Sequence, residues 1–173
     1  MAGGEARADL DVEGVFYRHS LMIPACNPGP NHCGPPTIRM GGLGPMMTQA
    51  AGEVADGFIA HPFQSRHSMQ TLMIPALEQG LAKSGRELDR FEIICATLVV
   101  TADREEEFAR VKDAARKQLA FYGSTPAYRP TLEAHGWQDL HLELNRLSKQ
   151  GRWDAMAELI SDEVLETIAV TPA

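Results

Sequence analysis

A chain of 173 residues is long enough for one domain with a sizeable core, and a composition of 44% hydrophobic and 23% charged residues is typical of a soluble globular protein. Sixteen Lys and Arg residues against 23 Asp and Glu residues give a formal net charge of -7, without a basic cluster, so nucleic-acid binding is not expected.

The apolar run 91–100 is shorter than the roughly 20 residues that span a bilayer. The first ten residues lack the apolar region of a secretory signal, and the three cysteines show no scaffold spacing, so we expect a cytoplasmic protein with reduced thiols and no membrane partner.

Residues 1–35 are expected to form a loose N-terminal segment that ends in a proline-rich connection. Up to about Asp11 the sequence offers few anchors for a core. One short extended segment is expected around residues 15–17. Between Pro24 and Pro36, five prolines and two glycines exclude a helix or a central strand.

Strands and helices are predicted to alternate from residue 36 onward. The strand candidates are 37–40, 58–60 and 91–100, and the last is apolar enough for a strand covered on both faces. Pro75 predicts a kink in the second helix, and Gly85 predicts its end. The alternation indicates an α/β fold with a parallel sheet and helical crossovers. The helices are expected at 46–55, 68–84, 105–122, 131–135, 140–150, 153–160 and 163–170.

The sequence GGLGP, from Gly41 to Pro45, stands between the first predicted strand and the first predicted helix. Glycines allow a ligand to approach the backbone closely. The start of the following helix offers free N–H groups and the positive end of its dipole, which together favour a phosphate. Two interpretations remain open: an anion-binding loop, or a tight turn without a ligand.

His61 follows the second predicted strand, at the end of a parallel sheet where ligands bind. It either contacts a phosphate or a cofactor ring, or is an ordinary hydrogen-bonded histidine at a strand end. Arg66 and His67 come next in the chain and are expected in a solvated loop.

A metal site is not predicted. Cys26, His32 and Cys33 are close in sequence but lack a second ligand pair at the spacing of a zinc site. There is no Ser-His-Asp arrangement and no nucleophile elbow, so no catalytic residue is assigned.

Several runs of the chain resemble the bacterial luciferase-like monooxygenase superfamily. The first is PPTIRMGGLGPMMTQAAGEVADGFIAHPF, in which a Pro-Pro strand, a glycine-rich loop and a helix ending in Ala-Asp-Gly follow one another in the order of that family. The next helix and strand of the pattern match LMIPALEQGLAKSGR and FEIICATLVVTADREEEF. Two later runs resemble the branch of coenzyme F420-dependent (deazaflavin-dependent) oxidoreductases. They are FYGSTPAYRPTLEAHGW and ELNRLSKQGRWDAM.

The resemblance implies a (β/α)8 TIM barrel with the cofactor at the C-terminal ends of the strands. The implied chemistry is hydride transfer between the cofactor and an organic substrate, with coenzyme F420 as the cofactor and FMN as the alternative. His61 is implied to lie near the same pocket. The residues implied to hold the cofactor phosphate are Gly41, Gly42, Leu43, Gly44, Pro45 and Met46.

The family pattern begins here at about its fifth strand, so residues 36–173 are expected to form the C-terminal portion of the barrel, with extra C-terminal helices. The absent half normally supplies the groups around the reactive ring. Two functions therefore remain open: a flavin- or deazaflavin-dependent oxidoreductase present as a fragment, or a non-catalytic barrel fragment that binds a phosphorylated small molecule or only self-associates. An open partial barrel exposes strand edges, so the expected partner is a second copy of the chain or the missing half.

Overall fold

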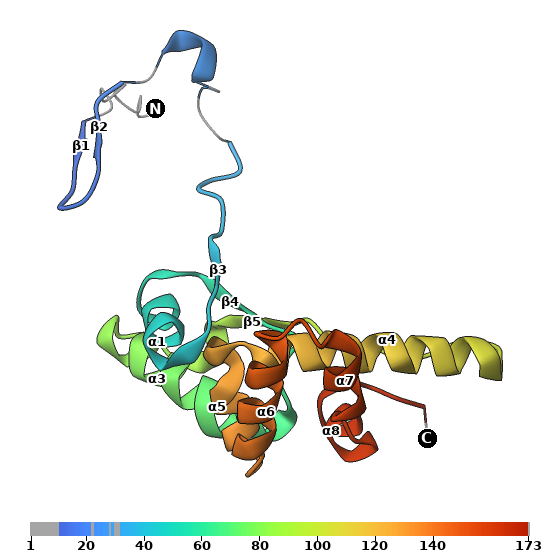
Figure 1. Ribbon diagram of the computed structural model, residues 1–173. Coiled ribbons are helices and arrows are strands. Elements are labelled where there is room, and N and C mark those ends of the chain that lie inside the picture. The colour runs from blue at the N-terminus through green and yellow to red at the C-terminus, as the bar shows by residue number, and fades with distance from the viewer. Residues whose placement is uncertain (1–10, 22, 28, 30–31, 173) are drawn as a thin grey trace. The chain divides into compact units, whose positions relative to one another are not determined.

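The computed structural model describes residues 11–21, 23–27, 29 and 32–172, and the chain separates into two units, 1–36 and 37–173. The predicted loose segment before Asp11 lies outside the described residues. The first unit contains an antiparallel hairpin of β1 (Val12–Glu13) and β2 (Arg18–His19), and a short 3-10 helix, η1 (Pro24–Cys26) (Figure 1).

The expectation of an extended segment around residues 15–17 is wrong. These residues form the turn of the hairpin, because the Gly14 N–H donates to the Tyr17 carbonyl at 2.9 Å and so closes the chain on itself. The strands lie on either side of this turn instead of within it.

The second unit is built on a three-stranded sheet of β3 (Arg39–Gly41), β4 (Gly57–Ala60) and β5 (Glu92–Cys95). The strands lie in the order β3-β4-β5, and both pairs are parallel. The prediction of three neighbouring parallel strands is confirmed. β5 ends earlier than predicted, because its last pair in the ladder is Ala60 with Cys95. Farther along, Val99 forms an isolated parallel bridge with Val170.

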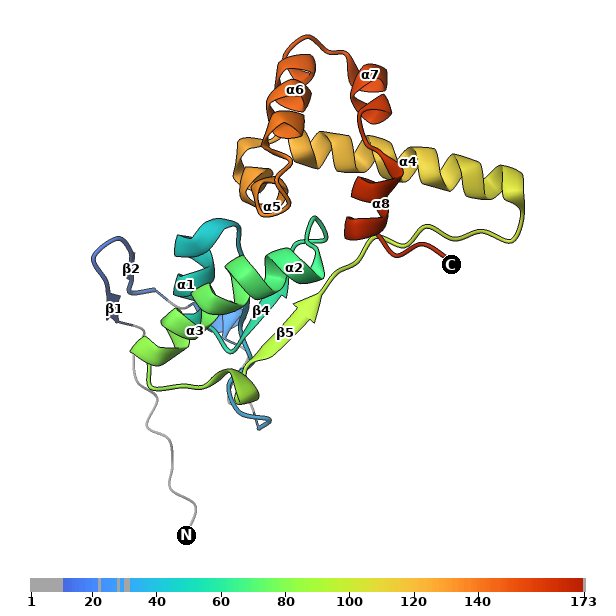
Figure 2. The ribbon, with the colours of Figure 1, turned by 90° about the horizontal axis from the view of Figure 1, so that it is seen from below.

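Helices connect the strands of this sheet, as Figure 2 shows. α1 (Gly44–Val54) joins β3 to β4. The helix predicted at 68–84 forms in three parts: α2 (Arg66–Ser68), a π-helical turn η2 (Met69–Met73) and α3 (Ile74–Lys83). The irregularity predicted from Pro75 takes the form of this π-helical turn, in which the Ile74 N–H reaches back to the Met69 carbonyl.

The end of α3 follows the predicted glycine signal. Gly85 has a φ of 66°, a conformation that residues other than glycine rarely adopt. The N–H of Arg86 then donates to the carbonyl of Leu81 at 2.9 Å, which closes the helix end. A 3-10 turn, η3 (Leu88–Arg90), leads into β5.

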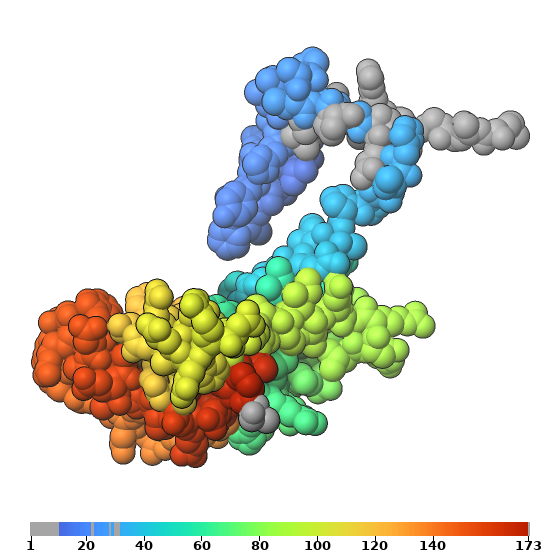
Figure 3. Space-filling view, turned by 90° about the vertical axis from the view of Figure 1, so that its right-hand side faces the viewer, coloured from blue at the N-terminus to red at the C-terminus, as the bar shows by residue number. Residues whose placement is uncertain are grey.

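A group of helices follows the sheet, in agreement with the predicted extra C-terminal helices (Figure 1). The yellow α4 lies against the orange and red helices in the space-filling view (Figure 3). The bounds are α4 (Glu105–Ser124), η4 (Pro126–Tyr128), α5 (Arg129–Glu133), α6 (Gln138–Ser148), α7 (Trp153–Glu158) and α8 (Asp162–Ile168).

Two apolar cores hold the second unit together. The first lies between one face of the sheet and helices α1 and α3, around Phe58, Leu77 and Leu81. The second lies among the C-terminal helices, around Leu119 and Leu144. Phe63, in the loop after β4, belongs to the second core, so this loop ties the sheet to the helices.

The opposite face of the sheet is open among the described residues. Ile59 is 42% exposed and Ile94 is 41% exposed, although both lie within strands. On the same face, Arg39 forms an ion pair with Glu92. The expectation that β5 is covered on both faces is therefore wrong for this chain, because the described helices that pack on the sheet lie on its other side. No helix formed by the described residues is both long and apolar enough to span a bilayer.

Candidate functional site

The glycine loop lies where β3 ends and α1 begins. Gly44 has a φ of 75°, so the left-handed conformation explains why glycine stands at this position. Pro45 occupies the first turn of α1, where its missing N–H removes no helical hydrogen bond. The sequence prediction of strand, glycine loop and helix is confirmed in this order.

The N-terminus of α1 is left without a side-chain cap. Leu43 is the N-cap residue, and its side chain cannot accept a hydrogen bond. The first N–H groups of a helix have no acceptor within the helix, and they carry the positive end of its dipole. By contrast, Ser65 caps α2 by accepting from the N–H of Ser68 at 3.0 Å. The start of α1 is therefore suited to an external anion.

A cavity of about 390 Å³, here called the glycine-loop cavity, opens at this helix start. It lies between α1, the π-helical turn and the segment that leads into α5. Five of the seven predicted site residues line it, while Gly41 and Met46 do not. These five are Gly42, Leu43, Gly44, Pro45 and His61, and further lining residues include Thr48, Gln64, Thr71, Gln79 and Thr131.

His61 directly follows β4 and makes two hydrogen bonds within the protein. Its Nδ1 accepts from the N–H of Phe63 at 3.1 Å, and its Nε2 lies 3.1 Å from the hydroxyl oxygen of Tyr128. The ring of Tyr122 packs edge-to-face with the same imidazole, with ring centroids 4.7 Å apart and planes at 84°. Burial lowers the pKa of His61 below its ordinary value, so the neutral form is favoured.

Tyr128 completes this aromatic cluster. Its ring centroid lies 4.6 Å from that of His61. Burial, with a smaller contribution from Tyr122, raises the pKa of the Tyr128 hydroxyl, so it stays protonated at neutral pH. His61 and Tyr128 are therefore both uncharged at neutral pH.

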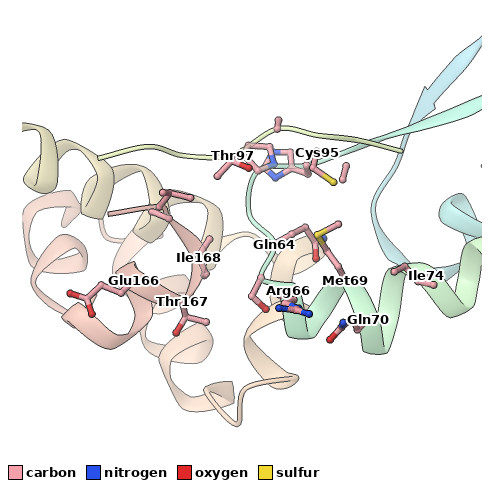
Figure 4. A pocket seen from close by; sticks show the side chains of 17 residues that line it. Gln64, Arg66, Met69, Gln70, Ile74, Cys95, Thr97, Glu166, Thr167 and Ile168 are labelled. Atoms are coloured by element: carbon pink, nitrogen blue, oxygen red, sulfur yellow. The ribbon is translucent and has the colours of Figure 1, made fainter. Parts of the chain in front are cut away.

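A second cavity, of about 430 Å³, also borders the loop after β4 (Figure 4). In the close-up, Gln64, Arg66 and Met69 line one side, Cys95 and Thr97 line another, and Glu166, Thr167 and Ile168 of α8 lie opposite. His61 and Gln64 line both cavities. The loop after β4 thus forms a wall shared by the two.

Arg66 and His67 were expected in a loop, and this expectation is wrong. Both belong to α2, because the capping serine Ser65 starts a helix immediately before them. The ring of His67 lies 5.3 Å from that of His135. The Nε2 of His135 in turn lies 2.7 Å from the hydroxyl of Ser65. Burial, and secondly the neighbouring His67, lower the pKa of His135.

Sequence reasoning missed the residues that reach the site from distant parts of the chain. Tyr128 is 67 positions away from His61, in the run FYGSTPAYRPTLEAHGW, which indicated only the family resemblance. Thr131 donates to the carbonyl of Phe63 across a similar separation, at 3.4 Å. No local spacing indicates such contacts. Among the described residues, no group of three or more His, Cys, Asp or Glu side chains has a geometry that could hold a metal ion.

Known proteins resemble this chain over most of its length. The sequence profile described as Luciferase-like monooxygenase matches residues 3–171. An uncharacterized protein of Mycobacterium tuberculosis is 49% identical over 161 residues, covering 93% of this chain and 47% of the relative. The 5,10-methylenetetrahydromethanopterin reductase of Archaeoglobus fulgidus is 29% identical over 145 residues, which cover 78% of this chain and 40% of the reductase. The F420-dependent glucose-6-phosphate dehydrogenase of Nakamurella multipartita is 29% identical over 141 residues, which cover 82% of this chain and 38% of the dehydrogenase.

A solved structure shows the same fold. The coenzyme F420-dependent tetrahydromethanopterin reductase from Methanopyrus kandleri aligns with a TM-score of 0.62 at 22% identity, covering 78% of this chain and 37% of that one. The predicted partial (β/α)8 barrel is confirmed by this similarity. The chain spans less than half the length of the curated relatives named above. Because the family profile matches nearly every residue, the chain belongs to the luciferase-like monooxygenase family.

Proposed function

We propose that this chain carries the cofactor-phosphate site of an F420-dependent oxidoreductase, which transfers hydride between the deazaflavin and an organic substrate. One observation carries the proposal: an uncapped helix start and a left-handed glycine open together on a cavity of about 390 Å³ at the C-terminal end of parallel strands. In barrel enzymes this is the end of the sheet where phosphates and cofactors bind. The F420-dependent names among the relatives favour the deazaflavin over FMN as the cofactor.

The residues present fit a phosphate at this position. The N–H groups at the start of α1 lack helical acceptors and can donate to phosphate oxygens. Gly42 stands close to Met47, and a Cβ on Gly42 would lie 3.0 Å from the Met47 Cβ, so a side chain at this position would force Met47 to shift. The hydroxyl of Thr48 donates to the Gly44 carbonyl at 2.8 Å and fixes the first turn.

The bound deazaflavin would supply the hydride chemistry, and this chain would hold and orient it. The loop would bind the phosphate, while His61, packed against Tyr122 and Tyr128, would exclude water from one wall of the cavity. The groups around the reactive ring would come from the remainder of the barrel. The whole-enzyme activity and its substrate are therefore proposed for the complete barrel and not for this portion alone.

The decisive experiment is titration of the purified chain with F420 and with FMN. Gly44→Ala is expected to weaken F420 binding by about 1–3 kcal/mol, the effect of losing one or two charge-assisted hydrogen bonds. Gly136→Ala is the matched control, because Gly136 also has a φ of 75°, also leaves open space for a Cβ, and lines neither cavity. It imposes the same backbone strain away from the site.

The exposed Cys26→Ser variant is a second control and should bind as the parent does. Circular dichroism checks that each variant is folded. Equal loss of affinity in Gly44→Ala and Gly136→Ala would assign the effect to backbone strain. Absence of binding to either cofactor at millimolar concentration would instead favour the second candidate, a non-catalytic barrel fragment, which the open face of the sheet also supports.

A further inference from the structure

His61 separates the two cavities, and its hydrogen bonds define its chemical state. A backbone N–H can only donate, so the Nδ1 that accepts from Phe63 must be the unprotonated nitrogen. In a neutral imidazole the proton then lies on Nε2, which donates to the hydroxyl oxygen of Tyr128 at 3.1 Å. Both ring nitrogens are thus bound by the protein.

We propose that Tyr128 is the positioning residue of His61. It holds the imidazole as a neutral wall between the two cavities, so that His61 contacts a ligand through the carbon atoms of its ring and not through a ring nitrogen. A phosphate in the glycine-loop cavity then depends on the backbone of the loop and receives no hydrogen bond from His61. The claim about the ligand rests on the proposed function, whereas the claim about the histidine does not.

The geometry distinguishes Tyr128 from its neighbour Tyr122. Both rings contact the imidazole at nearly equal centroid distances, 4.6 Å and 4.7 Å. Only the hydroxyl of Tyr128 reaches a ring nitrogen of His61. The hydroxyl of Tyr122 accepts instead from the side-chain amide of Gln118, at 2.9 Å. Removal of one hydroxyl or the other therefore tests the hydrogen bond with the packing retained.

The hydrogen bond between His61 and Tyr128 also determines where the phenolic hydrogen of Tyr128 can lie. If Nε2–H of His61 donates to Tyr128, the phenolic hydrogen of Tyr128 does not lie in that bond and is available to a further acceptor. No other described residue accepts it. The raised pKa of Tyr128 and the lowered pKa of His61 agree with this arrangement, because both keep the pair neutral.

The test is nitrogen NMR of the histidine rings in the labelled chain, with Tyr128→Phe and its matched control Tyr122→Phe. In the parent and in Tyr122→Phe, we expect an unprotonated Nδ1 and a protected Nε2–H proton signal for His61. In Tyr128→Phe, that proton should exchange with water and its signal should be lost. A protonated Nδ1 in the parent, or an Nε2–H signal that survives in Tyr128→Phe, would overturn the proposal.

A second variant keeps the test informative if Tyr128→Phe does not fold. His61→Phe retains an aromatic wall without nitrogens, so binding of inorganic phosphate to the loop should stay within about twofold of the parent, as for a change that removes no ligand hydrogen bond. A tenfold loss would show that a nitrogen of His61 contacts the anion. If F420 binds to no variant while the parent shows the expected tautomer, the proposed function fails and the role of Tyr128 stands.

Discussion

Gly52 of α1 and Gly80 of α3 lie against each other, and a Cβ placed on Gly52 would be 3.2 Å from the Cα of Gly80. The same Cβ would be only 2.4 Å from the carbonyl oxygen of Leu77. The two helices thus pack through their backbones at this point. Their contact brings α3, which lines the glycine-loop cavity, into its place beside α1.

Gly80→Ala is expected to lower the free energy of unfolding by about 1–3 kcal/mol, the usual cost of overpacking a core. A Cβ on Gly80 would lie 2.0 Å from the carbonyl oxygen of Gln49, so the helices must move apart. Urea unfolding measures the change. The control is Glu78→Ala, at an exposed position of the same helix, which should change the free energy by less than about 0.5 kcal/mol.

Arg86 closes the opposite end of α1. Its guanidinium donates to the carbonyls of Ala55 at 2.7 Å and Gly52 at 2.6 Å, the groups that a helix end leaves without partners. Lysine cannot reproduce this two-pronged geometry. Arg86→Lys should therefore destabilise the chain by about 1–3 kcal/mol. Arg90→Lys, at an exposed arginine at the end of η3, should be nearly neutral, and equal effects of the two changes would contradict the capping role.

Local sequence patterns predicted the parts of the fold that local physics determines. Each predicted helix and parallel strand from residue 37 onward is present, with ends displaced by a few residues, because apolar periodicity and glycine or proline signals act within one element. The one large displacement is β5, which ends at Cys95 because its neighbour β4 offers no further partner. The hairpin turn at residues 15–16 was missed, since its apolar side chains resemble those of a strand.

The candidate site was only partly predictable for the same reason. The glycine loop and His61 stand beside clear strand ends, so their positions follow from the sequence. The contact of Tyr128 with His61 joins residues from separate elements, and no spacing within one element indicates it. The π-helical turn likewise depends on how Pro75 is accommodated beside the sheet, and it supplies residues to both cavities.

Stability is expected to fall as the solution is acidified from about pH 7 to about pH 5. The pKa values of His61 and His135 are lowered from the ordinary 6.5 in the folded chain. The unfolded state therefore binds protons at a higher pH than the folded state. The stability that the two neutral histidines contribute is fully present above pH 6.5. It is lost as the pH falls from there through their lowered pKa values.

Urea unfolding across this pH range checks the prediction. His61→Gln and His135→Gln should each reduce the slope of stability against pH, because each removes one of the two groups. The lowered pKa values of Glu143 and Asp162, caused first by hydrogen bonds to Arg146 and Lys112, act in a more acidic window below about 4.5. An unchanged slope in both histidine variants would exclude the two rings as its source.

The open face of the sheet predicts association. Ile59 and Ile94 are exposed on it, and a parallel sheet is normally covered on both faces. We therefore expect a dimer, a larger oligomer or a complex with the remainder of a barrel, through this face or through the C-terminal helices. Light scattering at micromolar concentration measures the state of the isolated chain, and a monodisperse monomer would contradict self-association. Ile94→Lys should weaken association through the sheet, while Leu142→Lys, at an exposed position of α6, should weaken it only if the helices form the interface.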